Sequence, residues 1–135
     1  MDRILSLLGL MRKAGALVPG EDASSEAVLA GKARLLLLPC DAGEKKRGRA
    51  ERYTDGRSCL LVELPYSESE LSEAVGTGGC TMAAVTEIGF ADSLMKKLAE
   101  SDPDEYGQLS AEISGKYAKI TRRKTEKPGA KAWKK

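Results

Sequence analysis

The sequence contains no histidine, and its three cysteines lie far apart. Because histidine is the commonest metal ligand and the usual general base near neutral pH, the ordinary zinc and acid–base sites are missing. Cys40, Cys59 and Cys80 form no CxxC pair, and each lies in or beside an apolar run, so we expect three buried, reduced thiols. There is no phosphate-loop motif either. The sequence therefore predicts a protein that is not an enzyme and that uses no metal or cofactor.

Long apolar runs and aromatic residues are also scarce. No run approaches the roughly 18 apolar residues that cross a membrane, so no membrane partner is expected. The N-terminus lacks a signal-peptide cleavage pattern, which predicts a cytoplasmic protein. Residues 1–102, which we call the body, contain three aromatic residues, Tyr53, Tyr66 and Phe90. These are too few for a platform that stacks the bases of single-stranded RNA.

The charged residues are unevenly distributed along the chain. The net charge is only +2, but residues 115–135 carry nine Lys or Arg and one acid, whereas residues 1–114 carry 13 basic and 19 acidic residues. Of the residues after Pro103, only 105–113 have the pattern of a weak helix. We therefore predict one folded domain over residues 1–102 and a basic, disordered tail over residues 103–135.

Apolar spacing and turn residues predict alternating helices and strands in the body. The helices are expected at residues 2–14, 21–30, 43–52, 68–75 and 88–100. The strands are expected at residues 17–18, 35–38, 59–64 and 80–86, the first of them a short edge strand. Asp2, Ser67 and either Asp22 or Ser24 are the expected helix caps. This alternation with short connections favours a layered α/β domain with helices on both faces of a small sheet.

A series of short motifs along the body resembles one known family in order and spacing. The motifs are Leu8–Gly15, Gly20–Glu21, Ala30–Leu35, Asp41–Ala42, Val85–Thr86 and Gly89–Ala91. Together they resemble the kink-turn RNA-binding ribosomal proteins, named for archaeal L-seven-Ae, and within them the small bacterial YlxQ-like branch. The resemblance covers about residues 3–100. It implies a three-layer α-β-α sandwich around a mixed four-stranded sheet, in agreement with the order of elements above.

The resemblance also implies a site at the start of the second helix. In the family, a Gly-x-Asn-Glu-x-x-Lys pattern there reads sheared G·A pairs in a kinked RNA stem. In this chain Gly20 is kept, and Asp22 stands in place of the Asn. Ala23 replaces the Glu, and Glu26 replaces the Lys. Glu21 and Asp22 can accept hydrogen bonds from guanine N–H groups. Alternatively, they only complement the positive end of the helix dipole.

A second contact implied by the resemblance is the loop before the last strand. Its residues Thr77, Gly78 and Gly79 include two without a side chain, so a nucleotide can approach the backbone closely. The alternative is an ordinary helix-to-strand connection.

The basic run Lys45, Lys46 and Arg47, extended by Arg49 and Arg52, is the main basic cluster of the body. Such a cluster suits contacts with RNA phosphates. The alternative is a helix face that is simply exposed to water.

These features predict an RNA-binding protein, ribosome-associated or similar to a ribosomal protein. It would recognise ribosomal RNA or another structured RNA within a ribonucleoprotein, without catalysis. Ribosomal proteins and translation factors are the candidate protein partners. The alternative is an acidic module that binds a partner protein while its basic tail binds RNA non-specifically.

Overall fold

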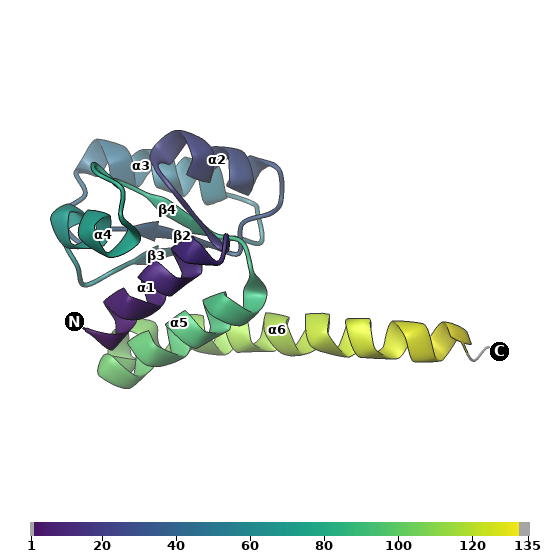
Figure 1. Cartoon of the computed structure of the whole chain (residues 1–135). Coiled ribbons are helices and arrows are strands. Elements are labelled where there is room, and N and C mark those ends of the chain that lie inside the picture. Colours follow the sequence, from purple (N-terminus) through teal and green to yellow (C-terminus); the bar gives the residue numbers. More distant parts are fainter. Residues whose placement is uncertain (1, 133–135) are drawn as a thin grey trace.

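A computed structural model describes residues 2–132 of the chain, with side chains as far as Ile120. The elements follow in the order α1 (Arg3–Lys13), β1 (Leu17–Pro19), α2 (Glu21–Leu29), β2 (Leu35–Leu38), α3 (Glu44–Thr54), β3 (Leu60–Glu63), α4 (Glu68–Val75), β4 (Ala83–Val85), α5 (Ile88–Ser101) and α6 (Pro103–Ala132). The predicted alternation of helices and strands is confirmed (Figure 1).

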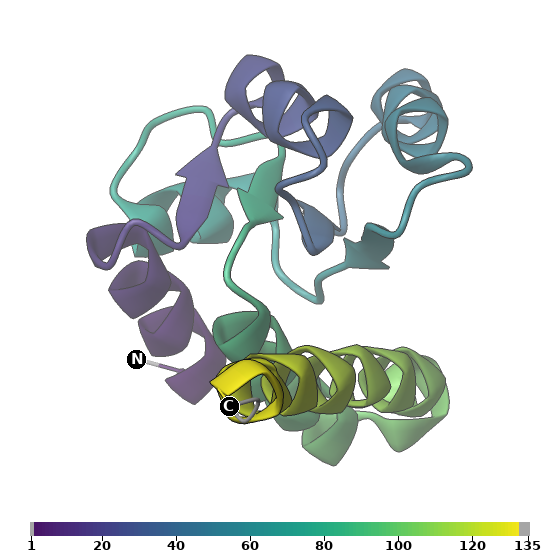
Figure 2. The same ribbon diagram turned by 90° about the vertical axis from the view of Figure 1, so that its right-hand side faces the viewer.

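The sheet is mixed and has the strand order β1-β4-β2-β3. Strand β2 is parallel to β3 and antiparallel to β4, and β1 pairs with β4 at the edge. All four leucines of β2 are buried because both faces of the sheet are covered. Leu35 and Leu37 face α1, α4 and α5, whereas Leu36 and Leu38 face α2 and α3. The predicted three-layer sandwich is therefore confirmed (Figure 2).

Two of the three predicted helix caps are confirmed. Asp2 accepts a hydrogen bond from the N–H of Ile4 at 2.7 Å, and Ser67 forms a capping box at α4. The prediction of Asp22 or Ser24 as the cap of α2 is wrong, because α2 begins directly after β1 and Gly20 occupies the cap position. The Ser24 hydroxyl instead donates to the Val18 carbonyl at 3.0 Å, which joins α2 to β1.

Two of the three cysteines match the prediction. Cys59 and Cys80 are buried free thiols, and burial raises the pKa of Cys59 to about 11. The prediction for Cys40 is wrong, because this thiol is exposed. Pro39 ends β2, and Cys40 lies in the turn beyond it, where its N–H donates to the Tyr66 carbonyl at 2.8 Å.

The prediction of a disordered tail over residues 103–135 is wrong for residues 103–132, because α6 is helical from Pro103 to Ala132; residues 133–135 lie outside the described part of the chain. Helix α6 packs along α5 and buries Tyr106 and Ile113 in the main core. Its apolar residues recur at helical spacing, a pattern that residues 105–113 already showed in part. The Tyr106 hydroxyl donates to the Glu63 carbonyl at 2.6 Å, and the Lys116 ammonium donates to the Ser58 carbonyl. Helix α6 thus runs antiparallel to β3 and is hydrogen-bonded to the end of this edge strand and to the residue two positions before its start.

Of the described helices, none is both long enough and apolar enough to cross a membrane. The described residues also form no cluster of Cys, Asp and Glu side chains suited to holding a metal ion.

Candidate nucleic-acid interface

The turn between β1 and α2 lies beside the loop before β4. The Gly20 N–H donates to the Met82 carbonyl at 2.7 Å, so the two segments meet where the β1–β4 pairing ends. Gly20 has a φ of 98°, a conformation that favours glycine. The structure therefore brings two of the predicted sites, the Gly20 turn and the Thr77–Gly79 loop, to one end of the sheet. We call this the Gly20 end.

The Thr77–Gly79 loop is held at both of its ends. The Thr77 N–H donates to the Ser72 carbonyl at 3.1 Å, and the Cys80 N–H donates to the Ser72 hydroxyl at 2.8 Å. Because Cys80 bonds to α4 in this way, β4 begins only at Ala83, later than the predicted residue 80. Gly78 and Gly79 are exposed between these anchors, so their backbone is accessible to a ligand.

The amino end of α2 carries no side-chain cap. The first N–H with an acceptor inside the helix is that of Ser24, which donates to the Gly20 carbonyl at 3.0 Å. The N–H groups of the preceding first turn therefore point out of the helix end, as hydrogen-bond donors for a ligand. Asp22 is exposed in the same turn, where its carboxylate complements the helix dipole.

The Glu21 carboxylate accepts hydrogen bonds from two side chains of α3. It accepts from Arg49 Nε at 2.6 Å and Nη2 at 3.0 Å, and from the Tyr53 hydroxyl at 2.8 Å. These bonds, the one from Arg49 first, hold the pKa of Glu21 below its ordinary value. Glu21 therefore ties α2 to α3, a role that neither alternative drawn from the sequence included. Arg49 and Tyr53 are four residues apart on one helix face, but nothing local identifies a partner 28 positions away.

The basic residues of α3 fall into two groups: arginines that pair with glutamates of other elements, and lysines that are exposed or half-buried. Arg47 pairs with Glu63 at the end of β3 and also donates to the Ala42 carbonyl at 3.5 Å. Lys45 is exposed and Lys46 half-buried in the first turn of α3. Lys46 is near enough to Glu21 to contribute to its lowered pKa. The lysines of this cluster are therefore better placed than Arg47 to reach phosphates beside the Gly20 turn.

The sequence resembles a named bacterial protein across most of that protein's length. Over 96 residues, which cover 68% of this chain and 91% of the relative, it is 33% identical to the RNA-binding protein YlxQ of Bacillus subtilis (strain 168). This chain belongs to the bacterial YlxQ branch of the L-seven-Ae family. The predicted family is thus confirmed, although no family model matches the chain.

Solved structures share the fold of this chain. A Bacillus halodurans C protein of unknown function superposes with a TM-score of 0.64 at 26% identity, covering 70% of this chain and 94% of its own. The Giardia lamblia 15.5kD RNA binding protein superposes with a TM-score of 0.56 at 19% identity, covering 86% of this chain and 88% of its own. The second likeness shows that the fold is shared.

Proposed function

We propose that this YlxQ-type protein recognises a structured RNA through the Gly20 end, without catalysis, as part of a ribonucleoprotein. The observation that carries the proposal is the meeting, at one end of the sheet, of an uncapped helix start, a glycine-containing loop and the lysines of α3. The name of the Bacillus subtilis relative, RNA-binding protein YlxQ, supports RNA as the ligand. Ribosomal RNA is our preferred target, with ribosomal proteins or translation factors as neighbours, which implies a cytoplasmic site of action.

Each part of the Gly20 end has a separate role in the proposal. The backbone N–H groups at the start of α2 donate to base or phosphate oxygens, and the Asp22 carboxylate accepts from guanine N–H groups. Gly78 and Gly79 let an unstacked nucleotide lie against the loop backbone. Lys45 and Lys46 bind phosphates. Glu21 acts as a positioning residue, because its carboxylate already holds Arg49 and Tyr53.

The test replaces Lys45 and Lys46 by alanine in the full-length protein. The control removes Lys96 and Lys97, another adjacent pair with one exposed and one half-buried member, located on α5. If both α3 lysines contact duplex phosphates, Lys45→Ala with Lys46→Ala should flatten the slope of log affinity against log salt by about 1.8. The α5 pair should leave the slope unchanged.

The competing function is an acidic module that binds a partner protein while the basic C-terminal segment binds RNA. The net charge of −6 over residues 1–114 favours it. It predicts that deleting residues 121–135 abolishes RNA binding and that the α3 pair and the α5 pair have equal effects. That combination would overturn the proposal for the Gly20 end.

A further inference from the structure

The end of the sheet opposite the Gly20 end carries a second group of cations. Strands β2 and β3 begin here, and α6 passes here before it projects from the body (Figure 1). Three segments, residues 31–34, 56–60 and 113–120, supply five basic residues, and Asp55, Glu87 and Glu112 are acidic residues that border them. We call them the opposite-end patch: Lys32, Arg34, Arg57, Lys116 and Lys119.

Hydrogen bonds to backbone carbonyls hold the three segments together. The Leu60 N–H donates to the Arg34 carbonyl at 3.1 Å, which joins the starts of β2 and β3. A hollow of about 240 Å³ next to them is lined by Arg57 and Ser58, among others. The Lys116 ammonium reaches the Ser58 carbonyl from α6. The patch is therefore continuous across two strands and a helix.

Among the described side chains, no acid forms an ion pair with these cations of the opposite-end patch. The buried Nε of Arg34 has no hydrogen-bond partner among the described residues, an arrangement that native proteins usually avoid. Lys32, Arg57 and Lys119 are exposed. By contrast, Arg47 and Arg49 on α3 are both paired with glutamates.

The shape of this surface suits an extended polyanion. The backbone of α6 continues to Ala132, and the segment 121–135 adds seven basic residues and one acidic residue. From Lys116 to Ala132 the helix is about 24 Å long, at 1.5 Å per residue. Five cations spread over three segments, followed along the chain by seven more basic residues, match a series of backbone phosphates better than they match a single small anion.

We propose that the opposite-end patch, which includes Lys116 and Lys119 of α6, binds the phosphates of a second RNA segment, so that the protein joins two RNA segments, one at each end of the sheet. Strand β2 separates the two surfaces by about 13 Å, at 3.3 Å per residue, and they face in opposite directions. The inference rests on the proposed function, because a bridge forms only if the Gly20 end also binds RNA.

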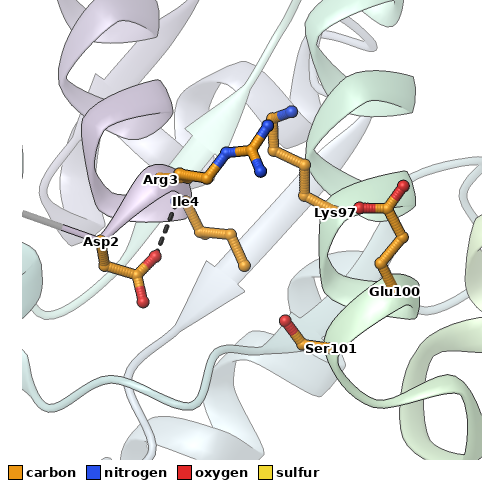
Figure 3. Close-up of a pocket in the computed structure, with 6 residues that line it drawn as sticks. All are labelled: Asp2, Arg3, Ile4, Lys97, Glu100 and Ser101. Atoms are coloured by element: carbon orange, nitrogen blue, oxygen red, sulfur yellow. Dashed lines mark hydrogen bonds between the residues drawn. The ribbon is translucent and has the colours of Figure 1, made fainter.

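The test measures bridging by the full-length protein. One RNA duplex is fixed to beads, the protein is added, and capture of a second, fluorescent duplex is recorded. The patch variant carries Arg57→Gln and Lys119→Gln. The control carries Arg3→Gln and Lys97→Gln, which change the net charge by the same amount. These two residues line a different hollow, of about 420 Å³, between α1 and α5 (Figure 3). Asp2 and Glu100 also line that hollow, so its charges are balanced.

We expect the patch variant to lose capture of the second duplex while the control retains it. In direct binding to one duplex, the salt slope of the patch variant should flatten by about 1.8 if both side chains contact phosphates. Equal capture by patch variant and control would overturn the bridging inference alone, provided that the Lys45 and Lys46 pair still affects binding. If the unmodified protein binds no RNA, the proposed function and the bridge both fail.

Discussion

The contact between Glu21 and Arg49 should contribute measurably to stability. Glu21→Gln keeps the shape of the side chain and removes its charge, which weakens three hydrogen bonds to α3. The side chains of Arg49 and Glu21 are 37% and 21% exposed, so solvent screens the pair only in part. Exposed ion pairs contribute at most about 1 kcal/mol, and charge-assisted hydrogen bonds about 1.5–3 kcal/mol. Between these limits we expect Glu21→Gln to cost about 1–2 kcal/mol in unfolding free energy at pH 7.

A double-mutant cycle in urea isolates this interaction. Glu21→Gln combined with Arg49→Gln should show a coupling energy of about 1 kcal/mol, typical of residues in direct contact. The control cycle combines Glu21→Gln with Arg52→Gln, an exposed arginine of the same helix, and should show a coupling energy near zero. Equal coupling energies in the two cycles would refute the assignment of Glu21 as a link between α2 and α3.

The pH dependence gives an independent measure of the same contact. The pKa of Glu21 in the folded protein lies below the ordinary value of 4.5. The unfolded chain therefore binds the proton more readily, and the stabilisation is fully present above pH 4.5. It is lost as the pH falls through the lower, folded pKa. The difference in unfolding free energy between the unmodified protein and Glu21→Gln should shrink as the pH is lowered from 5 to 3. A difference that is constant over this range would contradict the lowered pKa.

Two further predictions concern α6 and the start of α2. Ile113→Ala should cost about 2–5 kcal/mol in thermal or urea unfolding, because Ile113 is fully buried. Glu112→Ala, at the exposed position beside it, should cost less than about 0.5 kcal/mol; equal effects would mean that α6 is not part of the core. The triple change of Asp22→Asn, Ala23→Glu and Glu26→Lys should raise affinity for a kink-turn stem over an unkinked stem in gel-shift titrations. Equal gains for both RNAs would show only a non-specific effect of charge.

Local patterns were sufficient to predict most of the fold. Four consecutive leucines before Pro39 identify a strand that is covered on both faces, and Ser67 with Glu70 identifies the start of α4. Each of these signals comes from residues within a few positions of one another. The bacterial branch of the family was likewise predicted from short motifs whose order along the chain carries the information.

The tertiary structure decided what depends on residues far apart in the sequence. The stripe containing Ile113 looked too weak for a stable helix, because isolated helices draw little stability from propensity, and α5 and the edge of β3 supply the packing. The charge run on α3 gave no sign that Arg47 and Arg49 are paired, since their partners lie 16 and 28 positions away. Whether a charged side chain clamps two elements or stays exposed to a ligand depends on which acid the fold brings within hydrogen-bonding distance, and a sequence pattern does not contain that distance.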